Sequence, residues 1–382
     1  MRFRIIIKWG TLVSVLLFCL AIGYSAYMQL DMTDNDKRVD FFSLVPSDCI
    51  GVLESPDMTP LVNDASFFND EKIVENVRFP GLFQLLLDKL AEYSKNNEHG
   101  SISRSNRLLV SFHDAFNWEE QVVYLRANKE NEFFLDEMLQ TYVADVFLPK
   151  KEKYRGKALT VYPLSGNKFL TTYAEYGFWV MSFQKRLVEK VIDAGLDKTS
   201  LSDDALFSEI INKKKNKTSI HLYARSTSIP FYEISASCWS EYELYLNSDV
   251  FYLTGDTYLS DSLLDMEGNK NYEKSPFTVQ EDKLVISMDR DSTICLTNQA
   301  YHVIEDGNPS LFNECVASLS HEADFSMVVD MVKVEDEPKR FETFLPPFIL
   351  NNVSLFRPFI LSAQLSLNGD RFTQLWVFTY KN

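Results

Sequence analysis

Residues 359–380, FILSAQLSLNGDRFTQLWVFTY, decide the fold class more directly than any other stretch of the chain. Apolar and polar residues alternate on both sides of Asn368-Gly369, and an Asn-Gly pair between alternating runs is the strongest short-range signal for a β-hairpin. The stretch predicts one strand over 359–367 and a second over 371–380. So short a connection requires the two strands to run antiparallel.

Other apolar runs upstream predict more strands, and their connections are again too short for parallel crossovers. The predicted strands cover 49–53, 107–113, 121–127, 158–162, 168–173, 177–183, 219–223, 238–246, 250–259, 283–288, 293–297 and 325–332. Hairpins are expected between 107–113 and 121–127, between 238–246 and 250–259, and between 283–288 and 293–297.

Helices are predicted where apolar residues recur three and four positions apart. Those segments are 80–94, 132–147, 185–194, 202–215 and 308–319. Gly195 is predicted to close the third helix, Ser202 to cap the fourth and Asn308-Pro309 to open the last. The fold class is therefore α+β: an N-terminal transmembrane helix, then large antiparallel sheets with helices packed on one face. No repeat of fixed period is found.

The transmembrane helix is predicted from the N-terminal residues. Arg2, Arg4 and Lys8 precede residues 9–30, which carry no formal charge. A helix of that length spans about 33 Å, enough to cross a bilayer core of about 30 Å. Because basic residues stay on the cytoplasmic side, residues 31–382 are expected outside the cytoplasm. The expected location is the bacterial inner membrane, single-pass, with the C-terminal ectodomain in the periplasm.

Two alternatives to a retained signal-anchor are weighed. A cleaved signal peptide normally has an apolar region of only about 7–15 residues. A lipoprotein signal at Cys19 needs a small residue before the cysteine, where Phe18 is bulky. The length of the run favours the anchor, and all three interpretations export the rest of the chain.

The domains are predicted from composition and from the order of these elements. The predicted parts are a cytoplasmic stub and signal-anchor over 1–30, a polar tether over 31–43, an α+β first half over 44–230, and a β-rich second half over 231–382. The net charge is −16, and because residues 1–30 contribute three positive charges and no negative one, the exported part carries −19. That balance argues against nucleic acid and anionic lipid headgroups as partners.

The cysteines offer possible disulfides or buried thiols. Outside the apolar run they are Cys49, Cys238, Cys295 and Cys315. Four cysteines allow three full pairings, and the sequence does not choose among these or free thiols. None forms a CxxC pair, so a zinc site is not expected.

No catalytic residues and no cofactor are predicted. Ser111-Phe112-His113-Asp114 contains the residue types of a catalytic triad, but neighbours along a strand point to opposite faces. The acidic residues around Asp265 do not fit a calcium-binding loop, because Lys270 stands where glycine is needed at the sixth position and Pro276 where glutamate is needed at the twelfth.

Two binding features are weighed against ordinary structural roles. Aromatic residues of two predicted strands are candidates for a sugar-stacking platform, although core packing explains them more simply. They are Trp239, Tyr242, Tyr245, Tyr252 and Tyr258. Tyr245 shares strand parity with Trp239, whereas Tyr242 does not. The basic cluster 213–217 could bind an anion, although the end of a helix explains it more simply.

Several motifs recur together in a known group of proteins. They are 45–52 (VPSDCIGV), 154–156 (YRG), 178–182 (FWVMS), the predicted helix 185–194, Ser200-Leu201 and Phe207. In this order the chain resembles a family of uncharacterised, membrane-anchored bacterial envelope proteins, over residues 44–225. The resemblance implies a domain of unknown function in a Gram-negative envelope, with no catalytic residues to carry over.

From these features we expect a non-enzymatic single-pass envelope protein whose ectodomain binds another envelope component, a protein or a glycan. A membrane-anchored hydrolase acting on envelope glycan or peptide is the alternative, and it predicts a pocket with convergent carboxylates or a Ser/His pair. A lipid carrier, which needs an apolar cavity between sheet and helices, is the third hypothesis.

Overall fold

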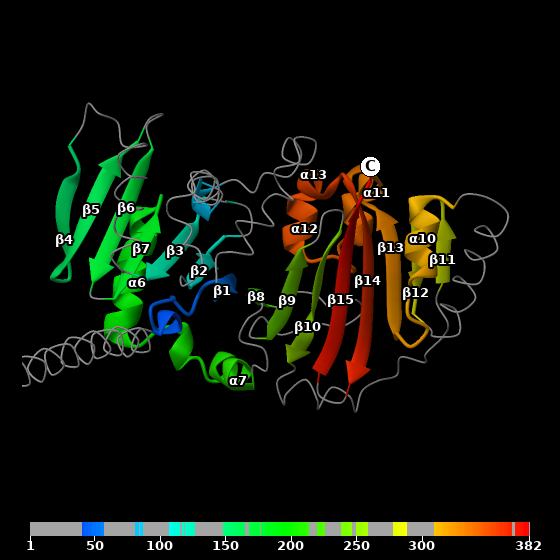
Figure 1. Cartoon of the computed structure of the whole chain (residues 1–382), viewed down its shortest axis with the longest axis horizontal. Helices are drawn as coiled ribbons and strands as arrows, with labels where there is room; N and C mark the ends of the chain where they lie inside the picture. The colour runs from blue at the N-terminus through cyan, green and yellow to red at the C-terminus, as the bar shows by residue number, and fades with distance from the viewer. Residues whose placement is uncertain are drawn as a thin grey trace, which may run out of the picture.

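The computed structural model places fifteen strands of the described part of the chain in one sheet (Figure 1). It describes residues 40–56, 81–83, 85–86, 107–114, 117, 119–126, 148–164, 168–175, 177–213, 220–225, 238–246, 250–258, 278–288, 309–368 and 371–381. Every pair of neighbouring strands is antiparallel. The antiparallel sheet of an α+β protein is thus confirmed, as one continuous sheet and not several.

The strands divide into two series along the chain. The first series is β1 (Gly51–Ser55), β2 (Leu108–Phe112), β3 (Gln121–Arg126), β4 (Lys150–Tyr154), β5 (Lys157–Pro163), β6 (Phe169–Glu175) and β7 (Phe178–Ser182). The second is β8 (Ile220–Arg225), β9 (Trp239–Leu246), β10 (Val250–Tyr258), β11 (Thr278–Glu281), β12 (Leu284–Ser287), β13 (Phe325–Asp330), β14 (Phe359–Asn368) and β15 (Arg371–Tyr380).

Both series follow the same route through the sheet. The first has the order β1-β2-β3-β7-β6-β5-β4, and the second has the order β8-β9-β10-β15-β14-β13-β12-β11. In each series, the first three strands run side by side, and the last strand of the meander that follows them pairs with the third strand. The two series join where β1 pairs with β8. The fixed-period search missed this repetition, because it lies in strand order and not in sequence.

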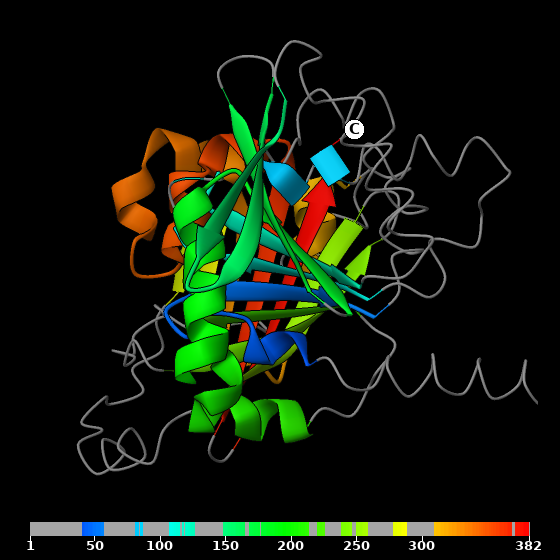
Figure 2. The same ribbon diagram turned by 90° about the vertical axis from the view of Figure 1, so that its left-hand side faces the viewer.

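The helices lie on both faces of the sheet. They are η1 (Phe41–Ser43), α6 (Lys185–Asp197), η3 (Leu201–Asp203), α7 (Ala205–Lys213), α10 (Leu311–Ala317), α11 (Met331–Asp336), η5 (Pro338–Phe341), α12 (Pro347–Asn351) and α13 (Val353–Phe356). We call the two sides the α6 face and the α11 face, after the longest described helix on each. Figure 2 shows α6 along the first half of the sheet, with α7 near its end.

Neighbouring residues of β2 show how both faces are buried. Leu109 belongs to the core under α6, α7 and η1, whereas Leu108 belongs to a second core with Leu82 and Leu86. Residues paired across neighbouring strands lie on the same side of the sheet, so the strand pairs relate these two cores to those of the second series. The first core lies on the same side of the sheet as the residues that contact α10. The second core lies on the same side as α11 and the segments after it. The prediction that helices pack on only one face of the sheet is wrong. Both faces are covered, and strands such as β1 are therefore buried at every residue.

Several predicted segments differ from the structure at their ends. Gly195 lies inside α6, which continues to Asp197 because Lys198 adopts the left-handed conformation and its N–H bonds the Ala194 carbonyl. Ser202 caps no helix: Ser200 and Asp203 form a capping box on η3, and the Asp204 carboxylate accepts the Phe207 N–H in α7. The helix predicted from 308 begins later, with Ser310 as its N-cap.

One predicted pairing is wrong, and several elements were missed. Strand β12 has β11 on one side and β13 on the other, so no edge remains for residues 293–297. Strands β4 and β11 were missed because neither shows a run of apolar residues. Strand β4, KKEKY, is an edge strand, and its lysines hinder pairing with other chains. The short helices α11–α13 were also not predicted.

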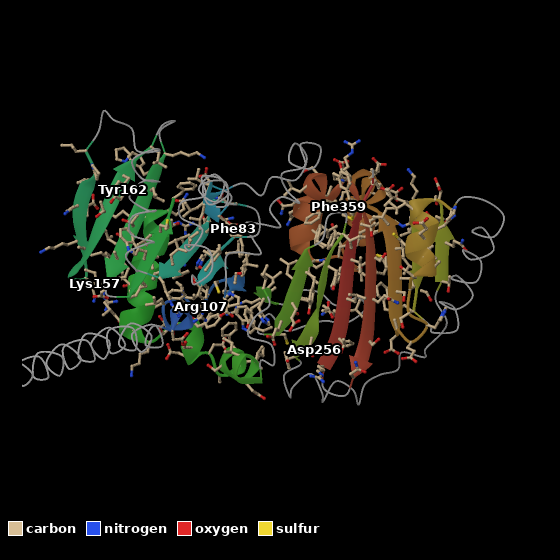
Figure 3. The ribbon with its side chains drawn as sticks, viewed as in Figure 1. Phe83, Arg107, Lys157, Tyr162, Asp256 and Phe359 are labelled. Carbon is tan, nitrogen blue, oxygen red and sulfur yellow. The ribbon has the colours of Figure 1, made fainter. Side chains whose placement is uncertain are left out.

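The first described segment is docked on the sheet. Phe41 and Phe42 of η1 are buried, although the tether was predicted to extend to residue 43. The Arg107 guanidinium lies 5.4 Å from the ring centre of each, and its Nη2 lies 2.7 Å from Glu54 Oε1. Figure 3 labels Arg107 where η1 meets the sheet. This docking leaves residues 31–39 between the predicted anchor and Asp40.

Some predictions fall outside the described residues. They are the anchor over 9–30, the helix over 132–147, the strand over 293–297 and most of the helix over 80–94, of which 82–83 and 85–86 are helical. Within the part of the chain that the structure describes, no helix combines the length and apolar character needed to cross a bilayer.

Candidate functional site

The candidate site is a part of the α6 face that we call the open face. It consists of alternate residues of three neighbouring strands. They are Glu241, Glu243 and Tyr245 of β9, Tyr252, Thr254 and Asp256 of β10, and Thr373, Leu375 and Val377 of β15. The register aligns them in three rows: Glu241 with Asp256 and Thr373, Glu243 with Thr254 and Leu375, and Tyr245 with Tyr252 and Val377.

On β15 the open face differs in burial from the opposite side of the same strand. Tyr245 is 36% exposed, and the other eight residues are partly exposed. On the α11 face, Gln374, Trp376 and Phe378 of β15 are buried at the positions between them. Strand β15 therefore alternates strictly, with one side in the core and the other in contact with solvent.

Tyr245 and Tyr252 form a stacked pair at one end of the open face. Their ring centres are 4.7 Å apart and their planes differ by 10°. The Tyr245 hydroxyl donates a hydrogen bond to Glu243 Oε2. The stack and this hydrogen bond hold a large aromatic surface in one orientation without burying it.

Three carboxylates give the rest of the open face an acidic character. Asp256 accepts a hydrogen bond of 2.8 Å from Thr373 Oγ1 and lies 3.2 Å from Arg371 Nη1. Glu241 Oε1 lies 3.4 Å from Nδ1 of the buried His221. Burial raises the pKa of Tyr223, and the negative charges of Glu54 and Glu241 raise it further.

Two helices bound the open face. On one side α7 packs against the first part of β9, where Phe207 and Trp239 have ring centres 4.9 Å apart. On the other side α10 packs on β13 and β14, and Cys315 Sγ lies 3.8 Å from Thr379 Oγ1. Between α7 and α10, the described part of the chain places no further helix over β9, β10 and β15 on this face.

The structure brings together only part of the predicted aromatic platform. Tyr245 and Tyr252 are partly exposed and in contact, whereas Trp239 is buried beneath α7 and Tyr258 packs against the same core. Tyr242 lies on the α11 face, as its strand parity predicted. There its hydroxyl donates to Gln374 Oε1 at 3.1 Å, and burial raises its pKa.

Sequence reasoning missed the acidic residues of the site. Glu241 and Glu243 have the parity of Tyr245 along the same predicted strand, which was a usable signal. Asp256 and Thr373 come next to them only through the register of three strands.

A second candidate is the Ser111 group: Ser111, His113 and Tyr124. Ser111 and His113 are two residues apart, so they lie on the same side of the strand. Ser111 Oγ lies 2.9 Å from His113 Nε2 and 3.2 Å from the Tyr124 hydroxyl. This is the Ser/His contact that the sequence argument considered improbable, and Asp114 lies outside it, exposed.

The Ser111 group lacks two requirements of a nucleophilic site. Ser111 is completely buried, so a substrate has no access to its hydroxyl. His113 Nδ1 has no hydrogen-bond partner among the described residues, and Asp48 is engaged by Lys190 at 2.5 Å. Burial lowers the pKa of His113 to about 4, so the ring is neutral at pH 7. The group acts as a buried polar contact within the first half.

The predicted cysteines separate into buried thiols and one residue outside the described range. Cys49, Cys238 and Cys315 are buried thiols, and burial raises the pKa of Cys49 to about 12. Cys295 lies outside the described residues. A thiol with so high a pKa is protonated at pH 7 and is therefore a poor nucleophile.

No metal-binding cluster of three or more His, Cys, Asp or Glu side chains occurs in the ranges that the structure covers. Asp256 is engaged by Thr373 and Arg371. The acidic loop around Asp265 and the residues 214–217 of the basic cluster lie outside the described residues.

Comparison with known proteins adds no assignment. No family model matches the chain, and no curated protein matches it. Among solved structures, crystal form IV of TP0453 is similar with a TM-score of 0.34 and 13% identity, covering 65% of this chain and 91% of that chain. Crystal form I of the same protein gives a TM-score of 0.32 and 12% identity over the same shares. Similarity at this level supports no conclusion about fold or function.

Proposed function

We propose that this chain is a non-enzymatic envelope protein of a Gram-negative bacterium, anchored in the inner membrane through residues 9–30, whose periplasmic body binds another envelope component through the open face. The proposal rests on the difference in helix cover between neighbouring parts of the α6 face. Described helices cover the α6 face on either side of β9, β10 and β15, and those strands keep an aromatic and acidic surface in contact with solvent.

The length of the tether supports the anchored arrangement. Nine residues separate Leu30 from Asp40, and an extended chain of nine residues reaches about 30 Å. Because η1 packs beside Arg107, the tether ends at a position that is fixed relative to the sheet. The open face would then be presented within a few nanometres of the membrane.

The absence of an accessible catalytic constellation among the described residues supports a binding role over hydrolysis. The Ser111 group is buried, and the carboxylates of the open face are engaged: Asp256 by Arg371, Glu243 by Tyr245 and Glu241 by His221. These contacts orient side chains, but they leave no free acid paired with a free base.

In-cell photo-crosslinking tests the binding role. A photoreactive amino acid placed at Thr254, in the centre of the open face, should give a specific adduct with an envelope component. The same residue at Leu196, an exposed position on α6, is the matched control. Equal adduct patterns at the two positions, or none at Thr254, would count against the open face.

Fractionation tests the anchor separately. The full chain should stay with the inner membrane after alkaline extraction, and its body should become accessible to protease only after the outer membrane is opened. Release by alkali, or protection from protease in spheroplasts, would overturn the membrane assignment.

A further inference from the structure

We propose that the component bound at the open face is a neutral or amino-bearing polysaccharide whose sugar rings stack on Tyr245 and Tyr252. This inference rests on the proposed function and deepens it. Three observations carry it: the geometry of the tyrosine pair, the position of the carboxylates and the size of the surface.

The tyrosine pair offers a rigid apolar surface to a sugar ring. The rings stack on each other at 4.7 Å, so a sugar would contact the outer face of either ring. Tyr245 remains 36% exposed in spite of the stack and of its hydrogen bond to Glu243. Aromatic side chains held in this way provide contact area at little cost in conformational entropy. The C–H faces of a pyranose are the matching apolar surface.

The carboxylates supply the polar half of carbohydrate recognition. Glu243 lies one row from the tyrosines, and Glu241 and Asp256 lie one row further, a step of about 7 Å along a strand. An ionised carboxylate only accepts hydrogen bonds, and it has about four lone-pair sites. Sugar hydroxyl groups donate, and ammonium groups of amino sugars donate more strongly.

The charge of the surface selects among polymers. Three acidic residues of the open face are flanked by Arg371, and the exported part of the chain is strongly acidic overall. Nucleic acids, anionic lipid headgroups and acidic polysaccharides would be repelled by such a field. Neutral and cationic glycans would not.

The size of the surface favours a glycan over a folded protein. Neighbouring strands are about 4.8 Å apart and residues rise about 3.4 Å along each, so the nine positions cover on the order of 200 Å². A stable protein interface buries about 800 Å² on each partner. The open face is therefore large enough for two or three sugar units but too small for most protein partners.

Titration calorimetry on the detergent-solubilised full chain tests the proposal. The probes are chitohexaose, cellohexaose and a chitosan hexamer, with the polyuronate alginate as the anionic comparison. At least one of the three neutral or cationic probes should bind saturably, and alginate should not. Tyr252→Ala should weaken that binding at least tenfold and Glu243→Gln several-fold, while Leu196→Ala leaves it unchanged.

Thermal melts of each variant confirm that it is folded. If none of the three probes binds, or if binding survives both Tyr245→Ala and Tyr252→Ala, the carbohydrate assignment is wrong. A protein adduct from the crosslinker at Thr254 would then leave the proposed function standing with a different partner. No adduct and no binding together would remove both proposals.

Discussion

The two halves of the sheet follow the same route but are covered differently. In the first half, α6 follows the last strand of the meander and packs on β3, β6 and β7. In the second half, the described helices come earlier: α10 precedes β13, and α11–α13 come between β13 and β14. The position equivalent to that of α6, over β10 and β15, has no described helix. The described helices are thus inserted at different points of the two meanders.

The residues on the equivalent strands match this difference in cover. Under α6, the side chains of Val122, Tyr124 and Val180 are completely buried. On the corresponding strands of the second half the α6 face carries Thr254, Asp256 and Leu375, which are partly exposed. A two-fold axis normal to the sheet between β1 and β8 relates the two strand orders and preserves the faces. The surface in the first half is core, whereas its counterpart in the second half is partly exposed.

The difference between the two surfaces is tested most directly by placing the same negative charge on each. Val180→Asp puts a carboxylate beneath α6 without a partner, and the free energy of unfolding should fall by about 4 kcal/mol or more. Leu375→Asp, on the equivalent strand, should lower it by about 1 kcal/mol or less. Urea denaturation of both variants measures the difference. Equal losses would show that the open face is covered.

The Ser111 group predicts a pH dependence that originates in the first half. The pKa of His113 is about 4 in the folded chain against about 6.5 when unfolded, chiefly because of burial, with Asp48 opposing and Lys190 and Arg186 adding to the shift. Between those values the unfolded chain binds more protons. The free energy of unfolding should therefore fall by roughly 3 kcal/mol as the pH drops from about 6.5 to about 4.

The variant His113→Gln isolates this effect, because the carboxylates titrate in both proteins. Denaturation curves at several pH values should show a steeper decline for the natural sequence than for the variant. Parallel declines would mean that His113 is accessible to solvent when folded.

Glycines of the two halves should respond in opposite directions to an added methyl group. A Cβ at Gly255 of β10 would lie 1.8 Å from the Glu241 carbonyl oxygen, so Gly255→Ala should lower the free energy of unfolding by about 2 kcal/mol. A Cβ at Gly195 of α6 would meet only Leu44 Cδ2, at 3.7 Å. Gly195→Ala should then raise stability by up to about 1 kcal/mol, since alanine favours helices. Melting temperatures of the two variants provide the check.

The smallest expected effect on stability concerns the tyrosine pair. Tyr252→Ala removes one stacked aromatic contact at a partly exposed position, and the loss should be below about 1.5 kcal/mol. A variant that stays folded but fails to bind would show that the pair serves recognition. A loss as large as that of Val180→Asp would instead assign Tyr252 to the core.

The sequence predicted what local patterns determine. The hairpin around Asn368-Gly369 was found because alternation and turn chemistry agree within about twenty residues, and the pair of β9 and β10 followed the same rule. The pairing of β1 with β8, and of β3 with β7, joins strands far apart in the chain. No local signal specifies such partners, so the single sheet and its repeated order could not be derived.

The same limit applied to the site. Strand parity correctly separated Tyr242 from Tyr245, because alternation is a property of one strand. The grouping of Tyr245 with Tyr252, and of Glu241 with Asp256, depends on register between strands. The contact of Ser111 with His113 joins residues two positions apart, which share a strand face, whereas adjacent residues do not.

The docked segment that precedes β1 has a mechanical consequence. A pull applied at Asp40 passes through residues 40–49 into β1, which is hydrogen-bonded to β2 on one side and β8 on the other. Tension along that strand would load both ladders in shear, whereas an edge strand such as β4 could be peeled away one hydrogen bond at a time. The rate of forced unfolding governs resistance in such a case. Two ladders would therefore resist together a force applied at Asp40.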